Sequence, residues 1–364
     1  MIYNVQALRA WAATIVMFVH LETLLRPLHD DVSHYLVAGQ VGVDLFFVIS
    51  GFVMVHTMRR KPVSAGAFFL NRIIRVVPLY WLLTLAVFAI AIVMPSLLQA
   101  TRASPAELVR SLLFIPFVKS NGLVAPVLFV GWTLNYEMFF YLLFTIAIAL
   151  TGRRLDATVS ATIAMIVALN IAGQLWHLKS TPWNFFTSSL MFEFAFGMLL
   201  GWLQPWRAPV PVRWSLSAGA VAMVALIAGP LLCPAVPAFC RSGIPAAIIV
   251  WAAISAETQG VRLDNRWVQL VGAASYSLYL THPFALQAFG HVSARIGRPV
   301  IALVLTPVAL ATAIVIAIIV HRLIERPMTD WLRAKSHHQL PVVEKAEPAV
   351  VGIDSGDGHG GAAV

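Results

Sequence analysis

The chain has 364 residues, of which 59% are hydrophobic and only 11% are charged. Soluble globular domains carry about 25% charged residues, so this composition excludes that class and indicates an integral membrane protein. The net charge of +9 does not require a nucleic-acid partner, and none is expected, because basic loops beside an anionic lipid leaflet give the same balance.

Several apolar segments are long enough to cross a bilayer as helices, since a hydrocarbon core of about 30 Å needs roughly 20 residues. The opening residues MIYNVQ lack the basic start of a signal peptide, so the first segment is expected to be retained as a span. The predicted fold is therefore all-α, a polytopic membrane protein with about ten transmembrane helices in one bundle within residues 1–335. The expected spans are residues 4–22, 39–58, 73–94, 128–150, 157–174, 185–203, 214–232, 242–256, 268–289 and 300–321.

Basic residues concentrate in every second connection between these spans. The cytoplasmic side of a membrane protein keeps its Lys and Arg residues because their translocation is unfavourable. Both termini are therefore predicted to be cytoplasmic. The residues that define this side are Arg59, Arg60, Lys61, Arg72, Arg75, Arg153, Arg154, Arg207, Arg213, Arg262, Arg266, Arg322, Arg326, Arg333, Lys335 and Lys345.

Within the first span, Arg9 and His20 are ionisable, and Glu22 stands at its end. An ionisable group at the bilayer centre costs about 2.5–3.5 kcal/mol, so those that persist usually face the bundle interior. Arg9 and His20 are 11 positions apart, which is about 16 Å of helical rise and about 20° of net rotation. They therefore share one helix face and would line one polar path. Taken singly, each also has a structural interpretation, in which Arg9 snorkels to the membrane surface and His20 is a core histidine.

The second and fourth spans each carry a carboxylate. Asp44 is expected at about the depth of His20, because the first two spans are antiparallel neighbours. A carboxylate there would orient the imidazole and raise its basicity, as general-base catalysis requires. Alternatively, Asp44 caps its helix at the water interface. Glu137, buried in the fourth span, needs a hydrogen-bonding partner or a proton.

Two further sets of polar residues follow the spacing of a helix face. Arg72 and Arg75 open the third span three residues apart, and the arginine fork suits phosphate, although a positive-inside pair has the same spacing. In the ninth span, Ser275, Tyr279 and His282 lie at i, i+4 and i+7. That stripe suits either a functional site or hydrogen bonding between helices.

Several segments lie outside the spans. Residues 96–127 form the longest external connection and are expected to contain an interfacial or re-entrant helix. Cys233 and Cys240 share an external loop, where the sequence fits either a disulfide or two thiols, and no cysteine–histidine spacing indicates a zinc site. Pro327 disfavours a further helical turn after the tenth span. Residues 336–364, rich in Gly, Pro and acidic residues, are predicted to be a disordered cytoplasmic tail.

Six short stretches stand out in chain order: RAWAATIVMFVH, GVDLFFVISGF, FFLNRIIRVVPLYW, WTLNYEMFFYLLF, YSLYLTHPF and a closing ERP. Their order and spacing resemble the acyltransferase 3 family of bacterial inner-membrane carbohydrate O-acyltransferases. The opening resembles the exopolysaccharide-production (ExoZ-type) members of that family. The resemblance covers about residues 3 to 330.

The resemblance implies transfer of an acyl group, usually acetyl, from cytoplasmic acyl-CoA to a hydroxyl of a lipid-linked or exported glycan. No permanently bound cofactor or metal is expected. Arg9 and His20 match the family's paired arginine and histidine, with the histidine implicated in transfer, and Arg72 and Arg75 match residues proposed to hold the CoA phosphates. The expected partners are acyl-CoA, the glycan acceptor, the lipid bilayer and the polysaccharide assembly machinery.

The mechanism that joins these observations makes His20 the base that takes the proton of the acceptor hydroxyl. Asp44 or Glu22 would orient its ring, and Tyr279 or Arg9 would stabilise the oxyanion. Glu137 and His282 complete the set of candidate catalytic residues, and a covalent relay through the histidine or Ser50 is a second route. Ser50, Glu137 and His282 all lie inside predicted spans.

Two other functions fit a polar path through a membrane bundle. A secondary transporter or flippase needs such a path, but transporters often show helix-breaking Gly or Pro at matched positions of two halves, and no such pairing is found. A structural subunit of a polysaccharide export complex would use its intramembrane polar residues for folding alone.

Overall fold

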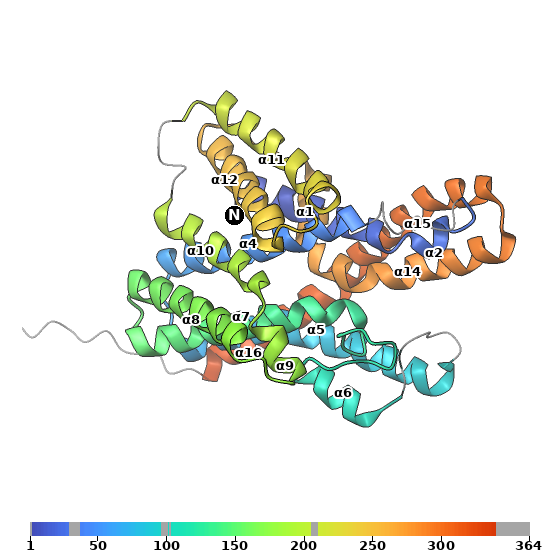
Figure 1. Ribbon diagram of the computed structural model, residues 1–364, viewed down its shortest axis with the longest axis horizontal. Coiled ribbons are helices and arrows are strands. Elements are labelled where there is room, and N and C mark those ends of the chain that lie inside the picture. Colours follow the sequence, from blue (N-terminus) through green and yellow to red (C-terminus); the bar gives the residue numbers. More distant parts are fainter. Residues whose placement is uncertain (1, 29–36, 96–100, 102, 205–209, 340–364) are drawn as a thin grey trace, which may run out of the picture.

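The computed structural model describes residues 2–28, 37–95, 101, 103–204 and 210–339, which form helices and connecting loops without a β-strand (Figure 1). The long helices are α1 (Tyr3–Val19), α4 (Val41–Arg60), α5 (Ala65–Val93), α7 (Trp132–Thr151), α8 (Leu155–Leu175), α10 (Phe192–Leu203), α11 (Val212–Leu232), α12 (Ile244–Thr258), α14 (Ser275–Ile296) and α15 (Pro299–Val320). Shorter ones are α2 (Glu22–Leu25), α6 (Pro105–Leu112), α9 (Thr181–Phe186), α13 (Arg266–Ala273) and α16 (Arg326–Gln339).

Within the described ranges, eight helical segments are long and apolar enough to cross a membrane. They coincide with eight of the ten predicted spans. The other two predicted spans are α1, which has 17 residues, and α14, whose apolar run is interrupted by Thr281 and His282. The prediction of an all-α, polytopic membrane protein is confirmed. The eight segments are Val41–Arg60, Ala65–Val93, Phe129–Thr151, Leu155–Leu175, Thr181–Leu203, Val212–Leu232, Phe239–Thr258 and Pro299–Ser336.

The helix ends follow local signals in the sequence. The Ser64 hydroxyl precedes α5 and accepts a hydrogen bond from the Ala67 amide, which satisfies one free donor of the first turn. Gly152 and Gly297 end α7 and α14 with φ of +63° and +66°, a left-handed conformation that glycine adopts without strain. After Gly297 the chain reverses into α15, and this hairpin stands at the right of Figure 1.

The chain does not leave the helix at Pro327. It passes from α15 through a π-helical turn, η7 (His321–Glu325), into α16, where Pro327 lies in the first turn. Pro327 directly follows the π-helical turn, in which the Arg326 amide donates to the His321 carbonyl five residues back, and the helix continues through it. Helix α16 reaches Gln339, four residues into the segment predicted to be disordered. Residues 340–364, like Arg207, lie outside the described part of the chain.

Helices α4 and α10 make the closest helix–helix contact of the bundle. A Cβ atom added at Gly51 would lie 2.1 Å from the Phe194 carbonyl oxygen, and one added at Gly197 would lie 1.9 Å from that of Val48. The two backbones therefore touch, as small residues allow in membrane helices. Phe47 and Phe194 stack beside this contact with ring centroids 4.5 Å apart. This contact fixes the position of α4, which carries one wall of the site.

The connection between α5 and α7 contains the short helix predicted for it, α6. Beyond α6 a single bridge joins Val118 to Val124, and the buried Lys119 ammonium donates hydrogen bonds to the Thr101 hydroxyl (3.0 Å) and the Val127 carbonyl (3.4 Å). Burial lowers the pKa of Lys119 from its ordinary 10.5 to about 8.

The two cysteines, whose pairing the sequence left open, are free thiols, with Cys233 exposed and Cys240 partly buried.

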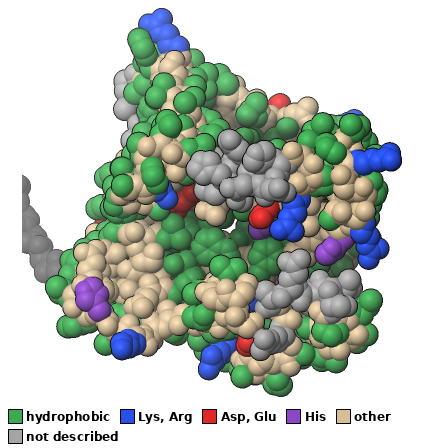
Figure 2. All heavy atoms as spheres, turned by 45° about the vertical axis from the view of Figure 1, so that its right-hand side comes forward, with side chains coloured by type: hydrophobic (Ala, Val, Ile, Leu, Met, Phe, Trp, Pro, Cys, Tyr) green, Lys and Arg blue, Asp and Glu red, His purple; other side chains and the backbone are tan. Residues whose placement is uncertain are grey.

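Seen from another side in Figure 2, the molecule is hollowed near its centre, and hydrophobic side chains line the hollow.

Candidate active site

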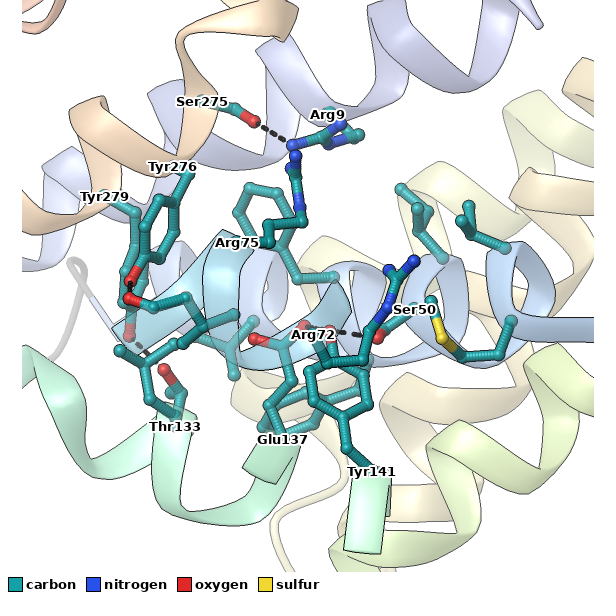
Figure 3. A pocket seen from close by; sticks show the side chains of 18 of the residues that line it. Arg9, Ser50, Arg72, Arg75, Thr133, Glu137, Tyr141, Ser275, Tyr276 and Tyr279 are labelled. Carbon is teal, nitrogen blue, oxygen red and sulfur yellow. Dashed lines mark hydrogen bonds between the residues drawn. The ribbon is translucent and has the colours of Figure 1, made fainter. Parts of the chain in front are cut away.

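A cavity of about 280 Å³ lies inside the bundle between α1, α4, α5, α7, α14 and α16 (Figure 3). Of the described residues that line it, four are arginines and one is acidic, Glu137. Arg9, Arg72 and Arg75 are half-buried and Arg333 is exposed, and one carboxylate does not balance these four positive charges, so the cavity is suited to an anionic ligand. The lining includes Arg9, Phe46, Phe47, Ser50, Arg72, Arg75, Thr133, Glu137, Tyr141, Ser275, Tyr276, Tyr279 and Arg333.

The arginine pair of α5 faces this cavity, as the spacing of three residues predicted. The Arg72 guanidinium packs against the rings of Phe68 (5.6 Å) and Tyr141 (5.9 Å), and its buried Nε has no hydrogen-bond partner. Figure 3 shows Arg75 extending toward Arg9. Two guanidinium groups that face each other favour a shared anion between them.

Arg9 and His20 use their common helix face to contact α14. The Arg9 guanidinium donates to the Ser275 hydroxyl (2.9 Å), while the His20 ring lies 5.0 Å from the His282 ring, centroid to centroid. The predicted stripe of α14 is therefore real, because Ser275 and His282 meet α1 at two levels. Arg9 lines the cavity, whereas the two histidines do not.

The histidine pair is mostly enclosed by aromatic rings. His20 contacts Phe129 edge-on at 5.2 Å. His282 is fully buried, and its Nδ1 lies 2.9 Å from the Leu278 carbonyl oxygen. Because a carbonyl only accepts, Nδ1 carries the proton, and Nε2, which has no hydrogen-bond partner, carries a free lone pair.

Tyr279 separates the cavity from the histidines. It lines the cavity, and its ring centroid is 6.1 Å from that of His282. Its hydroxyl donates to the Val130 carbonyl (2.9 Å) and accepts from Thr133 (2.8 Å). Since the single phenolic proton is already engaged, the geometry favours a positioning role for Tyr279 over the oxyanion-stabilising role predicted for it.

Glu137 has the partners that a buried carboxylate needs. It accepts hydrogen bonds from the Ser50 hydroxyl (3.2 Å) and from the Tyr141 hydroxyl. Tyr141 in turn packs under Arg72, so the carboxylate and the guanidinium are linked through one aromatic ring. Glu137 thus balances part of the positive charge of the cavity.

Asp44 is placed apart from this group. Its buried carboxyl faces that of Glu193 in α10, and it is absent from the described cavity lining. The ring contacts of His20 are with Phe129 and His282, so the expected orientation of His20 by Asp44 has no support here. Equal depth on antiparallel helices fixes height but not direction, and α4 turns Asp44 toward α10.

Four polar or charged lining residues were not singled out as site candidates from the sequence. Tyr141 is four residues after Glu137, so the i, i+4 rule signals it. Tyr276 donates to the Val76 carbonyl (2.6 Å), and Thr133 holds Tyr279, but neither has a sequence signal. Arg333 comes from α16, which an expected helix end at Pro327 conceals.

The structure is thus a multi-span bundle with a cationic cavity beside a histidine pair. A membrane protein of this kind can hold an anionic substrate next to a base. The family model described as "Acyltransferase domain" (Acyl_transf_3) matches residues 2–322. The chain therefore belongs to this acyltransferase family, and it is a membrane acyltransferase.

Two curated relatives are similar along most of the chain. "Exopolysaccharide production protein ExoZ" of Rhizobium meliloti (strain 1021) is 33% identical over 311 residues, which are 84% of this chain and 94% of that protein. "Acyltransferase MdmB" of Streptomyces mycarofaciens is 27% identical over 357 residues, 87% of this chain and 86% of that protein. No solved structure matches the chain. The resemblance to the acyltransferase 3 family and to its ExoZ-type members is confirmed.

Proposed function

We propose that the protein transfers an acyl group, in the simplest case acetyl, from cytoplasmic acyl-CoA to a hydroxyl of an exopolysaccharide or other cell-surface glycan. It would work in the bacterial inner membrane with both termini in the cytoplasm. The family supports acyl transfer, and the name of the 33% identical ExoZ relative supports an exopolysaccharide acceptor. The alternation of basic connections supports the orientation.

The observation that carries the proposal is the cavity with four arginines among its described lining residues. Acyl-CoA carries several phosphate charges on one end and a thioester on the other. Arg72, Arg75 and Arg333 are suited to the phosphates, because guanidinium forks bind phosphate oxygens in pairs. The cavity of about 280 Å³ is near the lower limit of ligand pockets, so it takes part of the donor while the rest lies toward α16.

The thioester would be delivered at the level of the histidine pair. His20 takes the proton of the acceptor hydroxyl as its oxygen attacks the thioester carbonyl carbon. The new C–O bond forms, the C–S bond breaks, and the thiolate leaves and takes the proton from the histidine as free CoA. Direct transfer by this route uses one base, whereas a covalent relay through the histidine or Ser50 needs a second acyl transfer.

The donor arm must pass Tyr279 to reach the histidines. Tyr279 is hydrogen-bonded to Val130, in the turn before the fourth span, and to Thr133, at the start of that span. These hydrogen bonds hold Tyr279 in the cavity wall, and a local shift of this turn would break them. His282, with its free Nε2, is placed to accept a proton beside His20.

The test is transfer of label from radiolabelled acetyl-CoA into glycan by membranes that contain the native protein or a His20→Ala variant at equal expression. Incorporation by the native protein and its loss in the variant is the expected result. Equal incorporation by both would remove His20 from the chemistry. A protein that moves labelled glycan across sealed vesicles without consuming acetyl-CoA would instead be a transporter.

A further inference from the structure

A second cavity, of about 820 Å³, lies on another side of α1, between α1, α11, α12 and α13. Its lining is almost entirely apolar and includes Leu8, Trp11, Leu216, Met223 and Ile249. Leu216 has 47% of its surface exposed, so the cavity opens to the surroundings of the bundle. In a membrane those surroundings are hydrocarbon, which makes this cavity a site for an apolar chain and not for water.

The polar lining residue at one end does not change this character. The Asn4 side-chain amide donates to the carbonyls of Ala253 (2.9 Å) and Val261 (2.8 Å), and its oxygen accepts from the Leu263 amide (2.8 Å). Asn4 therefore has no free donor or acceptor directed at a ligand. Its hydrogen bonds instead fix the loop that closes this end.

The length of the cavity corresponds to one leaflet. Along α1 it runs from Asn4 to Thr14, ten residues or about 15 Å of helical rise. A bilayer core is about 30 Å thick, so one acyl chain extends about half of it. The space exists because one wall is made of small residues, among them Ala7, Gly219 and Ala253.

A third cavity, of about 380 Å³, neighbours the apolar one. It is lined by Arg266, Trp267, Leu270 and Arg322, and Trp267 lines both cavities. The Arg266 guanidinium lies over the Trp267 ring, 5.0 Å from its centroid. Neither lining, as far as the chain is described, includes an acidic residue, and Glu257 nearby already accepts the amides of Tyr3 and Asn4.

We propose that these two neighbouring cavities, which share Trp267, bind one anionic phospholipid. Its phosphate lies between Arg266 and Arg322, and one of its acyl chains fills the apolar cavity along α1. Tryptophan is enriched in membrane proteins at the boundary between headgroups and hydrocarbon. Trp267, between the two cavities, has the corresponding position. The phosphate selects for negative charge, because two guanidinium groups in a described lining without a carboxylate favour an anion over a zwitterion.

This lipid would hold together elements that are distant in sequence. Its headgroup contacts α13 and η7, and its chain contacts α1, α11 and α12. None of the described residues that line these two cavities lines the arginine cavity. The site is therefore separate from the proposed donor site and does not depend on the proposed activity.

The experiment is native mass spectrometry of the purified protein in mild detergent with equal amounts of dioleoyl phosphatidylglycerol and dioleoyl phosphatidylcholine. The native protein should retain one phosphatidylglycerol in preference to phosphatidylcholine. The double variant Arg266→Gln, Arg322→Gln should bind it at least tenfold more weakly. Arg213→Gln is the matched control, since Arg213 also lies over a tryptophan, Trp214, but lines neither cavity, and it should bind like the native protein.

A second variant tests the chain independently of the headgroup. Ala220, exposed on α11 and part of the lining, can be changed to Trp to fill the apolar cavity without entering the core. This variant should also lose phosphatidylglycerol, at an unchanged melting temperature. Equal retention of both lipids, undiminished binding by both variants, or binding of inorganic phosphate without lipid would each overturn the proposal.

Discussion

Arg72 and His20 lie in different parts of the site, so replacing each of them should impair acyl transfer in a different way. Arg72 packs on Tyr141 in the arginine cavity, and His20 lies beside His282 beyond Tyr279. Removing one arginine–phosphate contact costs about 1–3 kcal/mol, so Arg72→Gln should raise KM for acyl-CoA about 10- to 100-fold with kcat largely kept. His20→Ala should abolish kcat while acyl-CoA still binds.

Steady-state kinetics and direct binding of acyl-CoA check this pair. Arg72→Lys is the control, because it keeps the charge and loses the fork, and it should lie between the native protein and Arg72→Gln. The roles assigned here would be wrong if Arg72→Gln and His20→Ala produced the same rise in KM with unchanged maximal rate.

Lys119 offers a test of pH dependence outside the spans. Burial lowers its pKa to about 8 from 10.5, so between these values the unfolded chain binds more protons than the folded one. Stability then rises with pH across this window, because the unfavourable buried charge is fully present below about pH 8 and is lost as the pH rises. In detergent, the melting temperature of the native protein relative to Lys119→Met should increase from about pH 7.5 to about pH 10. A constant difference over that range would mean that Lys119 is not buried as a charge.

At the scale of helices, the contact of α4 with α10 is the most sensitive to added volume. A Cβ at Gly197 would lie 1.9 Å from the Val48 carbonyl oxygen, so Gly197→Ala must push the helices apart, at about 1–3 kcal/mol. Gly66, with nothing within 4 Å of its added Cβ, is the matched control in α5. The melting temperature should fall for Gly197→Ala and hold or rise for Gly66→Ala. Equal values for the two variants would show that the backbones do not touch.

Hydropathy predicts where helices lie because each span must exceed the thickness of the hydrocarbon core, a condition that a single sequence reveals. It says less about direction. The relation of Arg9 to His20 was predictable from one helix alone, since 11 residues are close to three turns. The direction of Asp44 was not, because α4 contacts both α1 and α10, and packing decides which one it faces.

Helix α16 shows the same limit of prediction from local sequence. A proline after a span signals a break, yet the helix continues through Pro327 and its Arg333 reaches the cavity. The sequence holds the local information for both outcomes. What separates them is the contact of α16 with α5, a long-range interaction that no local pattern contains.

The whole molecule places the arginine cavity and the histidine pair at successive depths of one bundle. Arg9 and His20 are separated by about 16 Å along α1, and the cavity is on the Arg9 side. Arg333 in α16, beyond the last span, lies on that same side. A donor with several phosphate charges cannot cross the hydrocarbon core, so it has to approach from the end of the bundle that carries these arginines.

Sidedness follows as a prediction for sealed membranes. Labelled acetyl-CoA added outside inverted vesicles, whose cytoplasmic face is outward, should label glycan, whereas the same addition to right-side-out vesicles should not. Detergent should remove the difference, because it gives the donor access to both ends. Equal labelling by intact vesicles of both kinds would contradict the proposed cytoplasmic position of Arg72 and Arg333, and labelling by right-side-out vesicles alone would invert the proposed topology. An Arg72→Gln preparation serves as the control. It should label glycan more weakly than the native protein at limiting acetyl-CoA, and at saturating acetyl-CoA it should show the same sidedness.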